Sequence, residues 1–153
     1  MSKKSAGILL YRIKNRSLQV LLVHPGGPYW AKKDLNAWSI PKGEFEDEED
    51  PLTAAKRELE EETGIKASGN FIELVSVKQK SGKLVFAWAL EGDFNPANLK
   101  SNDFEMEWPP RSGKKKTFPE VDKAAWYNLN EAEQKIVEGQ IPFLTDLALK
   151  LDK

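Results

Sequence analysis

Four glutamate side chains crowd into five positions of the stretch AAKRELEEETGI, at Glu58, Glu60, Glu61 and Glu62. Carboxylates this close repel one another unless a cation lies between them. Hard divalent cations such as Mg²⁺ prefer carboxylate oxygens as ligands and would cancel the repulsion. On an α-helix each residue turns about 100°, so Glu58, Glu61 and Glu62 would share one face while Glu60 points away. The spacing therefore suits metal-assisted chemistry.

The residues around these glutamates predict the helix that would carry them. Asp50 followed by Pro51 is a typical helix start, and Gly64 is a typical stop. The helix would pack through an apolar stripe made of Leu52, Ala55 and Leu59. A solvated acidic face is the alternative, because glutamate is a good helix former. Against that alternative, only Lys56 and Arg57 lie nearby to relieve the negative charge.

The wider stretch Gly43–Ile65 resembles the Nudix box, G-x5-E-x7-R-E-U-x-E-E-x-G-U, in which U is a bulky aliphatic residue. Every specified position is filled, by Gly43, Glu49, Arg57, Glu58, Leu59, Glu61, Glu62, Gly64 and Ile65. The resemblance implies an α/β protein with the Nudix fold, an α/β/α sandwich around a mixed β-sheet. It also implies a loop–helix–loop that holds Mg²⁺ or Mn²⁺ against a diphosphate.

The same resemblance assigns roles to residues of the box. The metal-binding positions of the family correspond here to Gly43, Glu58, Glu61 and Glu62. Glu58 matches the position that binds metal or acts as a base, and Gly43 offers its carbonyl to the metal or lets the backbone approach closely. Arg57 is expected to pair with Glu49 and lock loop to helix. Glu60 falls at a free position and is left out.

Two residues outside the box are further candidates. Lys42, in the stretch WSIPKGE, is either a phosphate contact or a surface lysine. The Pro-Lys-Gly-Glu form resembles Nudix hydrolases of dinucleoside polyphosphates and of diphosphoinositol polyphosphates. Glu120 precedes a predicted strand, at a place where many family members supply another catalytic carboxylate. Glu105 and Glu107 are the rival candidates for that role.

Residues 95–120 read as a long loop with interior prolines, and a loop of this length in a compact domain is usually functional or mobile. Trp108 would stack on a base, and Arg111 together with 114–116, three lysines, would meet extra phosphates. Tyr29, in an earlier loop, is another aromatic candidate. The alternative is that residues 95–120 pack over the edge of the sheet and carry no ligand.

Composition bounds the remaining possibilities. The chain has 153 residues, a length that suits a single Nudix domain over 1–153, and 40% of them are hydrophobic. Its net charge of -1 argues against broad nucleic-acid binding. With no cysteine and no apolar run of about 20 residues, the chain is expected to be cytoplasmic and not in a membrane. Strands are predicted over 6–13, 18–24, 71–79, 83–92 and 123–129, and C-terminal helices over 130–139 and 141–150.

These observations predict a Mg²⁺- or Mn²⁺-dependent pyrophosphohydrolase, with Glu58, Glu61, Glu62 and Glu120 as catalytic residues. Its substrate would be a nucleoside diphosphate linked to another moiety, first of all a dinucleoside polyphosphate such as diadenosine tetraphosphate. The alternatives are a house-cleaning hydrolase of nucleoside triphosphates, nucleotide sugars or diphosphoinositol polyphosphates, or a non-catalytic nucleotide sensor with the same fold. The expected partner is a small nucleotide, and the sequence indicates no oligomeric state.

Overall fold

The centre of the protein is a seven-stranded mixed sheet. The computed structural model describes residues 3–151. The sheet consists of β1 (Lys4–Lys14), β2 (Ser17–Pro25), β3 (Lys42–Glu44), β4 (Phe71–Glu73), β5 (Val77–Lys78), β6 (Leu84–Glu91) and β9 (Val121–Asn128). The main strand order is β4-β6-β1-β2-β9, with β3 paired to β1 and β5 paired to β6. The β1–β6 pair is parallel and the others are antiparallel, so the predicted mixed sheet is confirmed.

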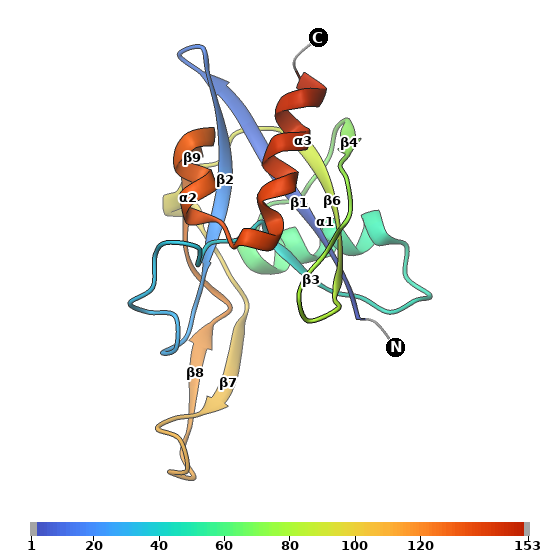
Figure 1. Ribbon diagram of the computed structural model, residues 1–153. Coiled ribbons are helices and arrows are strands. Elements are labelled where there is room, and N and C mark those ends of the chain that lie inside the picture. Colours follow the sequence, from blue (N-terminus) through green and yellow to red (C-terminus); the bar gives the residue numbers. More distant parts are fainter. Residues whose placement is uncertain (1–2, 152–153) are drawn as a thin grey trace.

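Helices cover both faces of this sheet (Figure 1). On one face α1 (Pro51–Thr63) packs against an apolar cluster that includes Ile8 and Leu21. On the other face lie α2 (Leu129–Lys135) and α3 (Ile141–Leu151), which bury Phe143 and neighbouring side chains. The two separate clusters correspond to the two layers of the predicted α/β/α sandwich, which is confirmed.

Strand β1 changes its partner along its length, and this change creates the opening in which the candidate site lies. Its C-terminal part pairs with β2, whereas Ser5, Ala6 and Gly7 pair with β3. A Cβ at Gly7 would lie 2.4 Å from the carbonyl oxygen of Pro41, so only glycine allows the chain entering β3 to come this close. Strand β3 is thereby inserted beside α1.

The prediction of an irregular loop over 95–120 is wrong. A short 3-10 segment, η1 (Pro96–Asn98), comes first. Strands β7 (Asp103–Glu107) and β8 (Lys115–Pro119) then form a separate two-stranded antiparallel sheet. Figure 1 shows this hairpin projecting away from the main sheet. Pro109 and Pro110 lie in the turn between β7 and β8, where they remove no strand hydrogen bond, while Pro96 opens η1 and Pro119 ends β8.

Two further boundaries differ from the predictions. The strand predicted over 71–79 is interrupted between β4 and β5, where Leu74 is buried and the N–H of Val75 donates to the Asp146 carboxylate of α3. The helix predicted over 130–139 ends at Lys135, since Ile136 forms a bridge to Trp38 and a 3-10 segment, η2 (Glu138–Gln140), follows. None of the helices within residues 3–151 combines the length and the apolar character that crossing a membrane requires.

Candidate active site

Helix α1 begins and ends where the sequence predicts. The side chain of Asp50 accepts a hydrogen bond from the backbone N–H of Thr53 at 3.0 Å, which caps the first turn. Gly64 adopts a left-handed conformation with φ of 87° and stops the helix. Ala54, Ala55 and Leu59 are fully buried against the sheet. The helix is therefore held by one side, which leaves its flank free to present charged groups.

That flank carries the predicted acidic face. Glu58 is only 8% exposed, and Glu61 and Glu62 are half-buried. Glu60, which the helical spacing directs away from this face, is exposed. Burial of carboxylates without balancing charge is unfavourable, so the face is not simply a solvated acidic surface.

Arg57 binds three of the surrounding carboxylates. Its Nη2 and Nε donate to the two carboxylate oxygens of Glu49 at 3.0 and 3.1 Å, in the bidentate geometry that suits guanidinium. Its Nη1 donates to Glu58 at 2.6 Å and lies 3.4 Å from Glu61. These partners, Glu49 foremost, raise the pKa of Arg57 further above its ordinary value. The predicted Arg57–Glu49 pair is confirmed, and it also orients two glutamates of the acidic face.

Strand β3 lies directly on the acidic face. A Cβ at Gly43 would lie 2.0 Å from the Glu58 carboxylate, so any other residue would displace that group. The backbone N–H of Lys42 donates to a carboxylate oxygen of Glu62 at 3.2 Å. The close backbone approach expected at Gly43 is therefore present, and it is made toward Glu58.

A pocket of about 160 Å³ joins the box to the end of the hairpin. It is lined by Val23, Pro25, Ser39, Ile40, Lys42, Glu62, Glu120 and Val121. The pocket thus brings together Lys42, Glu62 and Glu120, which the sequence places far apart. Glu105 and Glu107 are exposed strand residues of the hairpin and do not line this pocket, so the geometry favours Glu120 over these rivals.

Burial shifts the protonation of the groups in and around this pocket. It raises the pKa of Glu62 to about 8, against opposing contributions from Lys42. Burial also raises the pKa of Glu58 and of Glu120, and in both cases the charge of Glu61 adds to the effect. The pKa of Lys42 is lowered, first by burial and then by the neighbouring Lys83. The site therefore contains several carboxylates whose charged forms need a positive partner.

A divalent cation is such a partner, and the donor set fits it. Carboxylate oxygens and a backbone carbonyl are the ligands that Mg²⁺ and Mn²⁺ prefer. Within residues 3–151, no group of three acidic or histidine side chains already converges as a metal cluster. One reason is that Arg57 engages the carboxylates of Glu58 and Glu61. Each carboxylate has further lone pairs, so Glu58 and Glu61 can accept from Arg57 and still offer oxygen to a cation.

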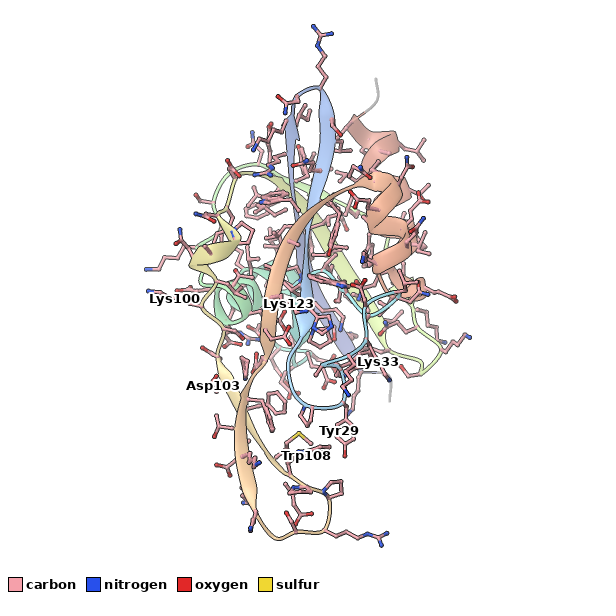
Figure 2. The ribbon with its side chains drawn as sticks, turned by 90° about the vertical axis from the view of Figure 1, so that its left-hand side faces the viewer. Tyr29, Lys33, Lys100, Asp103, Trp108 and Lys123 are labelled. Atoms are coloured by element: carbon pink, nitrogen blue, oxygen red, sulfur yellow. The ribbon has the colours of Figure 1, made fainter. Side chains whose placement is uncertain are left out.

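The predicted substrate contacts on the hairpin lie at its far end. Trp108 is half-buried, and its ring meets Tyr29 edge to face, with centroids 5.3 Å apart. Figure 2 shows Tyr29 and Trp108 meeting between the hairpin and the loop that follows β2. Arg111 is exposed in the turn, with φ of 61°. Trp108 is therefore part of an aromatic pair, and Arg111 is free of the main body.

Sequence reasoning missed the segment that ties the hairpin to the site. The backbone N–H of Asn102 donates to the carbonyl of Glu61, and the Asn102 carbonyl accepts from the N–H of Glu120, each at 2.8 Å. The Ser101 hydroxyl accepts a hydrogen bond from the N–H of Val121 at 2.9 Å. Because these are mostly backbone hydrogen bonds between distant segments, no pattern of residue types predicts them.

His24 and Trp38 take structural roles. His24 is 1% exposed, and its Nδ1 and Nε2 lie 2.8 Å from Asp122 and 2.7 Å from the carbonyl of Lys33. Trp38 is 4% exposed and contacts the His24 ring, as expected for a core residue. His24 thus fastens the loop that carries Tyr29 to strand β9.

The sequence of the chain is similar to a known protein family and to several named proteins. A family model described as "NUDIX domain" matches residues 1–147. The asymmetrical bis(5'-nucleosyl)-tetraphosphatase of Rattus norvegicus is 30% identical over 103 residues, which are 60% of this chain and 66% of that protein. Nudix hydrolase 7 of Arabidopsis thaliana is 31% identical over 113 residues, 69% of this chain and 38% of that protein. The chain thus spans less than two thirds of the length of these two relatives.

Solved structures show the same fold. An Ap4A hydrolase of Caenorhabditis elegans in a binary complex superposes with a TM-score of 0.68 at 21% identity, covering 96% of this chain and 97% of that one. The NUDIX domain of Shewanella oneidensis NrtR, complexed with ADP ribose, also gives 0.68, at 16% identity, with 99% and 89% covered. At these identities the likeness concerns the fold alone.

Proposed function

Since this chain belongs to the NUDIX domain family, we propose that it is a divalent-metal-dependent pyrophosphohydrolase. The observation that carries the proposal is the convergence of the box: Gly43 lies against Glu58, and Lys42 shares a pocket with Glu62 and Glu120. Curated relatives of the chain are named hydrolases, which supports the same reaction class. The proposed reaction splits the phosphoanhydride of a nucleoside diphosphate joined to another moiety.

The residues that would hold the metal are the carboxylates of Glu58, Glu61 and Glu62 and the carbonyl of Gly43. When bound, Mg²⁺ or Mn²⁺ neutralises charge on the phosphoryl oxygens and makes a neighbouring water easier to deprotonate. Arg57 would hold Glu49 against the helix and keep the acidic face in place. Lys42, pointing into the same pocket, would contact a phosphate.

The proton of the attacking water goes to a carboxylate. Burial raises the pKa of Glu120, which suits a general base, since a base works best when its pKa lies near the working pH. A water oxygen forms a bond to phosphorus, the bridging phosphorus–oxygen bond breaks, and the leaving phosphate departs with the electron pair. We assign Glu120 or Glu58 as the acceptor of the proton.

For the substrate we propose a dinucleoside polyphosphate such as diadenosine tetraphosphate. The tetraphosphatase relative from rat supports this choice, and so do Trp108 and Arg111, which offer an aromatic ring and a cation beyond the box. A nucleotide-binding role without catalysis is the second candidate, favoured by the ADP ribose complex of the Shewanella domain. The complete set of box glutamates favours catalysis over that candidate.

A substrate panel tests the proposal. Dinucleoside polyphosphates, nucleoside triphosphates, nucleotide sugars and diphosphoinositol polyphosphates are incubated with Mg²⁺ or Mn²⁺ in ¹⁸O-labelled water, and the products are identified by mass spectrometry. We expect the diadenosine tetraphosphate reaction to be fastest, with one labelled oxygen in a phosphate product. Absence of turnover on every compound, with binding of one of them, would favour the non-catalytic role.

A further inference from the structure

Glu120 of the candidate site is hydrogen-bonded to both the loop that follows β2 and the segment that leads into the hairpin. The N–H of Gly26 donates to the carbonyl of Glu120 at 2.9 Å, where the loop over 26–37 leaves strand β2. The N–H of Glu120 in turn donates to Asn102, at the start of the hairpin. The loop and the hairpin are therefore both anchored beside the pocket that contains Glu120.

One face of the hairpin is turned toward this loop. A Cβ at Gly27 would lie 3.1 Å from the Phe104 ring, and Tyr29 contacts Trp108. Side chains two residues apart in a strand share a face, and so do directly paired residues. The register pairs Met106 with Lys116, and the N–H of Trp108 donates to Lys114. The inner face of the hairpin thus consists of Phe104, Met106, Trp108, Lys114, Lys116 and Phe118.

Tyr29 and Trp108 form a corner at the outer end of this face. Their rings are inclined by 83°, so a planar group that stacks on one ring meets the other at a right angle. Tyr29 remains 57% exposed and its neighbour Trp30 38% exposed, which is more aromatic surface than packing of the loop requires. Figure 2 shows Tyr29 next to Trp108, with Lys100 on the opposite side of the view.

Unpaired cations accompany the corner. Within residues 3–151, Arg111, Lys114 and Lys116 have no carboxylate oxygen within 4.0 Å. Glu107 is nearby but accepts hydrogen bonds from the backbone N–H groups of Arg111 and Gly113. On the outer face, by contrast, Lys115 pairs with Glu105 at 3.7 Å. The inner face therefore combines apolar stacking surface with free positive charge.

We propose that the inner face of the hairpin, together with Tyr29, is a subsite for the distal nucleoside of a dinucleoside polyphosphate. Its base stacks in the corner between Tyr29 and Trp108, and its outer phosphates meet Lys114 and Lys116. Aromatic rings that stack on bases beside cations that meet phosphates are the usual means of holding a nucleotide without reading its sequence. The inference rests on the proposed function, because the proximal phosphates occupy the box.

Binding of non-hydrolysable ligands tests the subsite without turnover. Calorimetry compares a methylene-bridged dinucleoside tetraphosphate with a methylene-bridged nucleoside diphosphate. Tyr29→Ala should weaken the dinucleotide about tenfold or more, the loss of one stacking contact, while Tyr29→Phe retains the affinity. The double variant Lys114→Ser/Lys116→Ser should weaken it several-fold and reduce its dependence on salt. Lys115→Ser, on the outer face, is the matched control and should stay within about twofold.

The outcome depends on selectivity between the two ligands. Losses confined to the dinucleotide support the subsite, whereas equal losses on both ligands, or none, overturn it. A triphosphorylated oligonucleotide that binds more tightly than the dinucleotide, through the same residues, overturns the choice of occupant. A protein that binds the dinucleotide through Tyr29 but hydrolyses no substrate keeps the subsite and refutes the proposed function. The lysine variants, which are exposed, keep the test valid if Tyr29→Ala disturbs the loop.

Discussion

Helix α1 and the β7–β8 hairpin hold their charged side chains in very different ways. On α1 the glutamates are partly buried, bound by Arg57 and covered by strand β3. On the hairpin Lys114 and Lys116 are exposed, and the two strands form a sheet of their own. Groups that hold a reacting phosphate must have fixed positions. Groups that only select among long ligands can lie on an element outside the core, such as the hairpin. We infer that the chemistry belongs to α1 and the selectivity to the hairpin.

The largest effect is expected at the acidic face. Glu62→Gln removes a carboxylate that we assign to metal binding, and turnover should fall roughly 10²–10³-fold, the range for losing a group that stabilises charge in the transition state. Glu60→Gln is the matched control, because Glu60 is exposed on the opposite face of the same helix. Steady-state kinetics and melting curves are measured for both variants. Full activity of Glu62→Gln at low Mg²⁺ would contradict the assignment.

The second-largest loss of turnover is expected for Gly43→Ala. Its Cβ would lie 2.0 Å from the Glu58 carboxylate, the mobile end of a side chain, so the side chain can move away without unfolding the protein. We expect turnover to fall about 10- to 100-fold, as for a misplaced catalytic group, with little change in melting temperature. Gly139→Ala is the control, since a Cβ there meets only an ordinary contact at 3.5 Å. A large drop in melting temperature with normal turnover would show that Gly43 serves the fold alone.

The next effect is a pH dependence of the free energy of unfolding, which we expect from Glu62 on α1. Without metal, burial raises the pKa of Glu62 from 4.5 to about 8. The folded protein then keeps a proton that the unfolded chain has lost, so the free energy of unfolding falls as pH rises through this window. The slope from this group reaches about 1.4 kcal/mol per pH unit. Urea unfolding between pH 4.5 and 8.5 measures it, and Glu62→Gln should flatten the curve; an unchanged slope would mean that Glu62 is ionised in the folded state.

The smallest effect is expected on the hairpin. The Glu107 carboxylate accepts hydrogen bonds from the backbone N–H groups of Arg111 and Gly113, but it is exposed. Glu107→Ala should therefore lower the free energy of unfolding by only about 0.5–1 kcal/mol, because water replaces the lost bonds. Denaturant titration measures the change. A loss of several kcal/mol would show that the hairpin folds as part of the core, which would remove the contrast with α1.

The sequence predicted the box and its helix closely, because their determinants are local. Asp50, Pro51 and Gly64 define the ends of α1 by their own conformational preferences, and the period of the helix places Glu60 opposite the other glutamates. The pair between Arg57 and Glu49 follows from the spacing of the box. Such features need no knowledge of how distant segments meet.

The hairpin and the pocket were not predictable in the same way. Prolines at 109 and 110 obscured two short strands whose pairing is set by the turn between them. The pocket depends on backbone hydrogen bonds of Asn102 to Glu61 and Glu120, which any residue type can make. Residue patterns therefore identify the carboxylates that could bind metal or accept a proton. That Lys42 and Glu120 line the same pocket is visible only in the folded structure.

A metal titration of thermal stability tests the central claim, that the acidic face of α1 is a divalent-metal site, most directly. The melting temperature is followed with increasing Mg²⁺ or Mn²⁺, with sodium at equal ionic strength as reference, for the wild type and for Glu60→Gln, Glu61→Gln and Glu62→Gln. A ligand that binds only the folded state raises the melting temperature by mass action. We predict a saturable rise with divalent ions in the wild type and Glu60→Gln that disappears in Glu61→Gln and Glu62→Gln. Equal shifts with sodium, or a full divalent shift in Glu61→Gln and Glu62→Gln, would contradict the claim.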